Sequence, residues 1–133
     1  MAVGLHTTNL VIPLLKLLMG NSTAGLATIA ALWVQLHTAD PGAAGTTAVS
    51  VGDATRKQIT FSTPGANVLS LSASPSVWTD AATSETITHI SVWSLITAGV
   101  VYFTVVLTAS QPWVATNTFT LNTLTFTLTP VMA

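Results

Sequence analysis

The sequence predicts a mainly β protein, an antiparallel β-sandwich of jelly-roll-like type with one short N-terminal α-helix. Three observations support this fold class: short β-branched and aromatic runs alternate with turn signals from Thr55 onwards, strands do not alternate with helices, and only the N-terminal segment has a helical spacing of leucines. We expect the 133 residues to form one domain, with a helix and connector over residues 1–25 and the sandwich over residues 26–133.

The N-terminal segment predicts a short helix. Four leucines share one face, because they fall at the i, i+4, i+7 and i+8 positions: Leu10, Leu14, Leu17 and Leu18. The polar residues 7–9 are suitable N-caps, Pro13 suits a first turn, and Gly20 suits the C-terminal end. The leucine face is a candidate interface, either with the sandwich of the same chain or with a neighbouring subunit.

The apolar stretch Leu26 to His37 is compatible with a buried strand or a second helix, and a strand is favoured from Ala31 onwards. Trp33-Val34 is an aromatic and β-branched pair, and the run stops abruptly at Asp40-Pro41-Gly42. Asp-Pro-Gly signals a turn, because proline presets φ, glycine tolerates a positive φ, and the aspartate can accept nearby backbone N–H groups. The aperiodic residues 43–53 predict a loop.

Further strands are predicted by alternating or continuous apolar runs: around Ile59 and Phe61, at Val68–Leu71 after a Pro64-Gly65 turn, at Ile87–Trp93, and at Val100–Leu107. The Val100–Leu107 run is nearly all apolar, as expected of a strand buried on both faces. Gln111-Pro112 is expected to interrupt the chain after it.

The last predicted strand contains a change of register. The alternation that begins at Phe119 and Leu121 resumes one residue out of step at Leu124 and continues to Leu128. Since a one-residue slip turns every later side chain to the opposite face, we expect a bulge or kink at Asn122-Thr123.

Charge is unusually scarce, with three basic and four acidic residues, or 5% of the chain, against about a quarter in ordinary globular domains. A surface so poor in charge does little to keep copies apart in solution, so we expect much of it to contact other subunits. Three basic residues cannot follow a phosphate backbone, which argues against nucleic acid as a partner. The chain has no cysteine and therefore no disulfide or thiolate metal site.

A membrane or signal segment is not expected. Lys16 and the polar residues 20–23 divide the apolar region between Leu10 and Leu36, and neither half reaches the roughly 20 residues of a spanning helix. Only His6 precedes this region, whereas a secretory signal begins with basic residues.

Catalytic, metal and cofactor sites are not expected either. The three histidines, His6, His37 and His89, lie more than thirty residues apart without a zinc-ligand pattern, and His89 within a strand is typical of a packed residue. The four acids suit capping and turn roles, and the serines lack a Gly-x-Ser-x-Gly elbow.

Two groups remain as candidate contacts with a partner. Arg56-Lys57 is the only basic cluster and is either a solvated strand start or a site for an acidic patch of a partner. Trp33 and Trp93 lie within apolar strands and are expected in the core, whereas Trp78 and Trp113 lie near prolines and are expected as surface anchors. An interface role for those two is favoured over stacking on a sugar.

The segment Leu36-His37-Thr38-Ala39-Asp40-Pro41-Gly42 resembles an L-[HS]-T-A-D-P-G signature of small bacteriophage virion proteins of tail fibre, minor tail or head-decoration type. In that group an apolar helix and a strand precede the motif, and a Gly/Ala-rich loop follows it. Residues 53–61 are similar to the family's next strand start, and Ile87–Trp93 to its I-T-H-[IVF]-[GS]-[ILV]-[WF] strand. The chain departs from the family in its shortened Thr97-Ala98-Gly99 segment and in the absence of an acidic residue within the loop that follows Gly42.

The resemblance implies a non-enzymatic virion structural protein without cofactors. We expect a homo-oligomer, with a trimer favoured, that binds major capsid or tail proteins of the same particle. A capsid decoration or minor capsid subunit is the favoured role, and the exposed sheet edges would be covered by neighbours. The alternatives are a minor tail or tail-fibre-base protein, or a carbohydrate-binding module that recognises host-surface glycans through Trp78 or Trp113.

Overall fold

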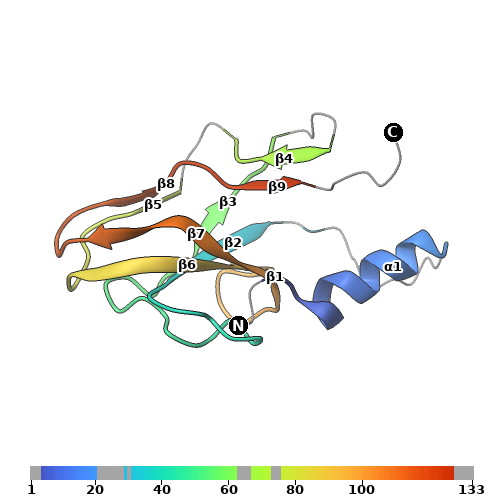
Figure 1. Ribbon diagram of the computed structural model, residues 1–133, viewed down its shortest axis with the longest axis horizontal. Helices are drawn as coiled ribbons and strands as arrows, with labels where there is room; N and C mark the ends of the chain where they lie inside the picture. The colour runs from blue at the N-terminus through green and yellow to red at the C-terminus, as the bar shows by residue number, and fades with distance from the viewer. Residues whose placement is uncertain (1–3, 21–28, 30, 63–66, 73–75, 128–133) are drawn as a thin grey trace.

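The structure is a computed structural model that describes residues 4–20, 29, 31–62, 67–72 and 76–127. Two layers of antiparallel strands form the body, and a single helical arm leaves it near the N-terminus (Figure 1). The antiparallel β-sandwich with one short N-terminal helix is thereby confirmed. The predicted Pro64-Gly65 turn, the start of the Leu26–His37 run and the strand end at Leu128 lie outside the described residues.

The first layer is a five-stranded sheet in which every neighbouring pair is antiparallel. Its order is β1 (Gly4–Leu5), β7 (Val101–Trp113), β6 (Glu85–Trp93), β2 (Leu32–His37) and β3 (Lys57–Ile59). β2 begins one residue after the predicted start at Ala31 and pairs from Trp33 to His37 with β6. The start of the first sequence motif, Leu36-His37, therefore lies beside the second motif, Ile87–Trp93.

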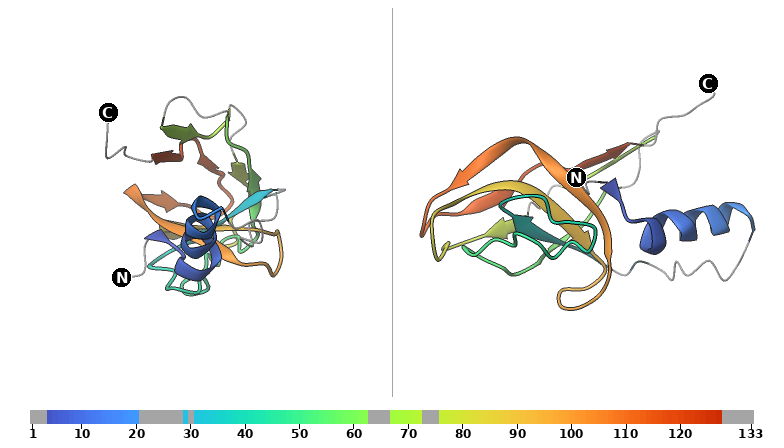
Figure 2. Two further views of the ribbon diagram at one scale, coloured as in Figure 1. Left: turned by 90° about the vertical axis from the view of Figure 1, so that its right-hand side faces the viewer. Right: turned by 60° about the horizontal axis from the view of Figure 1, so that its bottom comes forward.

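The second layer consists of two short ladders that lie over the sheet (Figures 1 and 2). They are β4 (Val68–Ser70) with β9 (Thr125–Thr127), and β5 (Ser76–Trp78) with β8 (Phe119–Leu121). The chain leaves regular strand geometry between Leu121 and Thr125, where it changes partner from β5 to β4. This break coincides with the bulge or kink predicted at Asn122-Thr123.

The core lies between the layers. One face of the sheet contributes aliphatic side chains that are fully buried: Val34, Leu36, Ile90 and Val92. The second layer contributes Trp78, Phe119 and Leu121 to the same cluster, and the Trp78 and Phe119 rings meet edge to face at 5.9 Å. Alternate residues of β2 and β6 therefore supply the apolar face that a two-layer sandwich requires.

The opposite face of the sheet is covered by the aperiodic loop that follows β2. The predicted Asp-Pro-Gly turn is present: Gly42 has φ of 71°, and its N–H donates to the Asp40 carboxylate at 2.9 Å. Further along, Gly45 lies so close to the sheet that an added Cβ would stand 3.0 Å from both Trp93 Cζ2 and Val101 Cγ2. The polar residues His37 and Ser91 on this second face of β2 and β6 are buried.

Two expectations for β7 are wrong. Gln111-Pro112 does not interrupt the chain, because β7 continues to Trp113 with Pro112 opposite Thr86. Among the described residues the outer edge of β7 is paired only at Phe103 and Thr104, so a residue without an N–H is tolerated beyond them. β7 is also not buried on both faces: Val106 is 53% exposed, as an antiparallel strand with one solvated face allows.

The helical arm begins as a π-helical turn, η1 (Thr7–Val11), and continues as α1 (Ile12–Leu18). The N-cap was predicted among residues 7–9, but these residues lie within η1. The N-cap of η1 is His6, whose ring accepts the Asn9 N–H at 3.2 Å. Pro13 lies in the first turn of α1, and Gly20, with φ of 74°, follows its last residues, both as expected.

Candidate functional site

Among the described residues, the hydrogen bonds that fix the arm to the body lie at its root. The His6 N–H donates to the Tyr102 carbonyl at 2.7 Å, and the Asn9 side-chain amide donates to the Val101 carbonyl at 2.9 Å, so η1 is tied to β7. Leu10 belongs to the core cluster. Beyond it α1 projects from one end of the strand layers (Figures 1 and 2).

Most of α1 is apolar and exposed. Of the four leucines predicted to share a face, Leu10 is buried, whereas exposure rises through Leu14 and Leu17 to 84% at Leu18. Other exposed apolar side chains surround them: Ile12, Leu15 and Met19. Lys16 is the only charged residue of this helix. A helix that is apolar all round is ordinarily buried, whereas the apolar surface of α1 is exposed to solvent.

Beside the root of the arm lies an apolar groove of about 250 Å³. Its walls come from the arm and from both strand layers, and include Leu14, Leu32, Phe61, Leu69, Tyr102 and Phe126. Phe103, which also lines it, packs against Phe126 with ring centroids 6.0 Å apart and so joins the layers at this point. We call α1 together with this groove the apolar end.

The covered face of the sheet holds a buried chain of hydrogen bonds. His37 lies 2.8 Å through Nδ1 from the Thr47 carbonyl and 2.7 Å through Nε2 from Ser91 Oγ, which also accepts the Trp93 indole N–H at 2.7 Å. Because a carbonyl can only accept, Nδ1 carries the proton and Nε2 accepts from Ser91. Burial lowers the pKa of His37 below its usual 6.5, despite the opposing bond to Thr47.

Arg56 is engaged within its own chain. Its guanidinium stacks 3.6 Å from the centre of the Trp93 ring, and Nη1 donates to the carbonyls of Leu95 and Ala98 at 3.0 and 2.6 Å. Burial lowers the pKa of this guanidinium from its usual value. The residue therefore holds the segment that joins β6 to β7, whereas its neighbour Lys57 approaches Asp53 at 4.0 Å.

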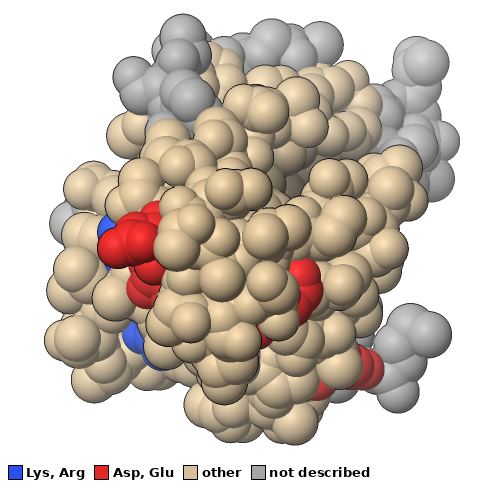
Figure 3. All heavy atoms as spheres, turned by 90° about the vertical axis from the view of Figure 1, so that its left-hand side faces the viewer, with Lys and Arg blue, Asp and Glu red and all other residues tan. Residues whose placement is uncertain are grey.

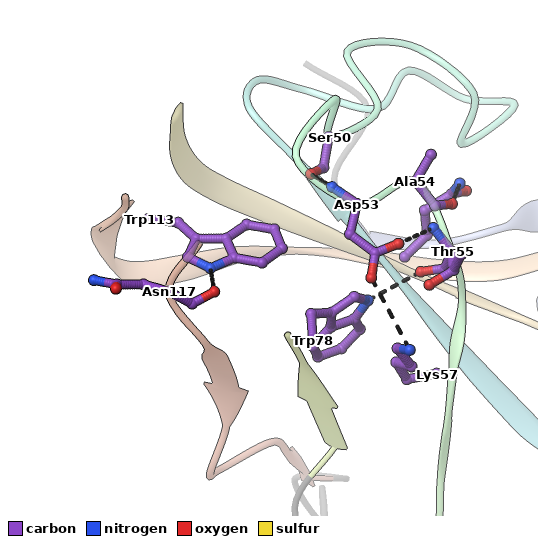
Figure 4. Close-up of polar contacts among 9 residues, drawn as sticks. Ser50, Asp53, Ala54, Thr55, Lys57, Trp78, Trp113 and Asn117 are labelled. Atoms are coloured by element: carbon purple, nitrogen blue, oxygen red, sulfur yellow. Dashed lines mark hydrogen bonds and ion pairs between the residues drawn. The ribbon is translucent and has the colours of Figure 1, made fainter. Parts of the chain in front are cut away.

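Trp78 and Trp113 are not surface anchors, contrary to the prediction. They are 0% and 2% exposed, and both pack against Phe119. Each indole N–H donates to a backbone carbonyl at 2.9 Å, that of Thr55 for Trp78 and that of Asn117 for Trp113 (Figure 4). Neither ring offers a face to a sugar, so glycan recognition through these residues is excluded in this structure. Of the tryptophans expected in the core, Trp93 is buried and Trp33 is half-buried.

Glu85 binds the end of the covering loop, a role that the sequence did not indicate. Its carboxylate accepts the hydroxyl of Ser50 and the backbone N–H groups of Val51 and Gly52, the last two at 3.1 Å. The carboxylate therefore holds the end of the covering loop on β6. No local pattern could have predicted this contact, because more than thirty residues separate the partners.

The described residues contain no cluster of three or more His, Cys, Asp or Glu that could hold a metal ion. Within the same residues, no helix is long and apolar enough to span a membrane. Uncharged surface dominates the face shown in Figure 3, where charged side chains stand in small separate groups. Among the described residues, the apolar end combines exposed apolar side chains with an apolar groove.

No curated protein matches this chain. Residues 7–129 match the family described as podophage GP4 fiber I protein gp80. The match spans the helical arm and every strand from β2 to β9. The chain therefore belongs to this family of phage fibre proteins and is a structural protein of a phage virion.

Proposed function

We propose that this chain is a non-enzymatic subunit of a phage tail fibre that joins other protein subunits of the same virion through its apolar end. The observation that carries the proposal is the exposed apolar surface of α1 beside an apolar groove. Association would remove this surface from water, which is favourable by about 25 cal/mol per Å² before the costs of association.

The polar side chains of the described residues support a structural role. His37, Ser91 and Trp93 satisfy one another inside the sheet, and Glu85 is bound to the covering loop. An acid–base catalyst needs a titratable group that can reach a substrate, and these groups are occupied by their own chain.

The family match favours the fibre over the capsid-decoration role that the composition and resemblance had favoured. We retain a homo-oligomer as part of the proposal, with capsid or tail proteins of the virion as further partners. The resemblance favours a trimer, and a measurement of the mass of the oligomer distinguishes a trimer from other oligomeric states.

Quantitative mass spectrometry of purified virions tests the proposal. A fibre subunit should be present at a small fraction of the copies of the major capsid protein. A ratio near one to one or one to three would instead place the chain on the capsid lattice as a decoration subunit. Absence from purified particles would contradict a virion role altogether. Native mass spectrometry of the isolated chain gives the oligomeric state in the same preparation.

A further inference from the structure

We propose that the groove of the apolar end receives helix α1 of a second copy of this chain. The inference rests on the proposed function, since it names the partner of the surface that this function uses. Its first support is the arrangement of arm and groove. Leu14, near the root of α1, lines the groove of its own chain, but the exposed Leu17 and Leu18 farther along do not.

The chemistry of the groove restricts its occupant. Its lining side chains are all apolar except Tyr102, and none is charged. An occupant must therefore bring apolar side chains and almost no charge, because an unpaired charge in such a site would lose its hydration without compensation. α1 meets this requirement: it has one charged residue, Lys16, whose long side chain can keep its ammonium group in water.

The amount of surface also favours a second copy. Six apolar side chains of α1 and its C-cap are between 38% and 84% exposed. At roughly 100 Å² for a fully exposed aliphatic side chain, they offer about 350 Å² of apolar area per copy. If every copy gives one helix and receives one in its groove, each copy buries the apolar surface of its helix and, in addition, the exposed side chains of its groove, so the total moves toward the roughly 800 Å² per partner of stable interfaces. A different protein that covered only the helix would bury the helix surface alone.

Disulfide trapping between differently tagged copies tests this contact. The chain has no cysteine, so introduced cysteines report alone. One tagged copy carries Leu18→Cys on the helix, and the co-expressed copy with another tag carries Leu69→Cys in the groove. Mild oxidation should join the two tags in a large share of the protein. The control pair combines Leu69→Cys with Ile96→Cys, which is 51% exposed on the segment between β6 and β7, and should show background linkage.

A second groove position guards against a folding defect. Ile29 lines the groove and is 42% exposed, so Ile29→Cys should be tolerated and should also link to Leu18→Cys. Equal linkage of the helix and control pairs would overturn the inference. The inference would also be overturned if the variants fold, as verified by circular dichroism, but neither groove cysteine links to the helix cysteine. Linkage of the helix cysteine only to a different virion protein counts as this second result.

The outcomes separate the inference from the proposed function. If the chain occurs in virions at fibre copy number but no linkage forms, the helix contact is wrong and the fibre role stands. If linkage forms but the chain is absent from virions, the contact stands and the fibre role is wrong.

Discussion

The hydroxyl of Ser91 and the ring of His37 share a hydrogen bond of 2.7 Å inside the sheet, and this bond joins the two sequence motifs of the chain. His37 belongs to the Leu-His-Thr-Ala-Asp-Pro-Gly segment on β2, and Ser91 to the Ile-Thr-His strand β6. The indole of Trp93 extends the chain of bonds on one side and the Thr47 carbonyl on the other. The motifs therefore position the covering loop by a buried polar network that favours neutral His37.

The network predicts that acid destabilises the fold through His37. Burial lowers the pKa of folded His37, so the unfolded chain takes up the proton first, and stability falls as pH drops from about 6.5 towards the folded pKa. The slope should reach at most about 1.4 kcal/mol per pH unit. Urea denaturation at pH 7.5 and 5.5, at one protein concentration, measures it. His37→Asn should show a shallower slope, and an unchanged slope would refute this origin.

Arg56 should hold the segment between β6 and β7 in a way that lysine cannot reproduce. Arg56→Lys loses the planar stacking on Trp93 and the paired donation to Leu95 and Ala98, so we expect a loss of about 1–3 kcal/mol and faster amide exchange across residues 94–100. Lys57→Gln is the matched control, because its ion pair with the half-buried Asp53 has a long contact of 4.0 Å and is worth about 0–1 kcal/mol. Equal effects of the two substitutions on amide exchange would contradict this role.

Trp78 should stabilise the fold and take no part in glycan binding. Trp78→Phe keeps a ring in the core but removes the bond from the indole N–H to the Thr55 carbonyl, which should cost about 1–3 kcal/mol of unfolding free energy. Trp78→Ala should cost about 3–5 kcal/mol because it also leaves a cavity. Thermal and urea unfolding measure both losses. The prediction would be contradicted if Trp78→Ala were as stable as the unaltered protein but lost a binding to cell-wall glycan that the unaltered protein shows.

Two glycines should respond differently to alanine. Gly20 and Gly45 both have positive φ, but an added Cβ meets nothing within 4 Å at Gly20, whereas at Gly45 it meets Trp93 and Val101 at 3.0 Å. Gly20→Ala should cost only the backbone strain of about 1–2 kcal/mol. Gly45→Ala should cost distinctly more and should alter Trp93 fluorescence, because it displaces the covering loop. Equal losses would mean that the loop does not lie against the sheet as described.

The fold was predictable where the periodicity was local. The strands predicted from Ala31 onwards and at Ile87–Trp93, the Asp-Pro-Gly turn and the break after Leu121 all follow from residue patterns of short range. Trp78 was misplaced because nearby prolines suggested the surface, whereas its burial depends on the pairing of β5 with β8, which are about forty residues apart.

The candidate site was predictable only in part. The leucine spacing predicted the helix, but it could not show that Leu10 packs in the core while Leu18 extends into solvent. The apolar groove needs Leu32, Phe61 and Phe126 to converge, which no local pattern indicates. The same limit applies to the aperiodic covering loop, whose contacts with Glu85 and the sheet are all of long range.

Immunogold labelling of intact virions tests the fibre role most directly. Antibody raised against this chain should label filaments at the tail-bearing end of the particle, and particles whose gene for the chain carries a stop codon should lose this label. Label distributed evenly over the head, or no label on particles that contain all other virion proteins, would contradict the fibre role.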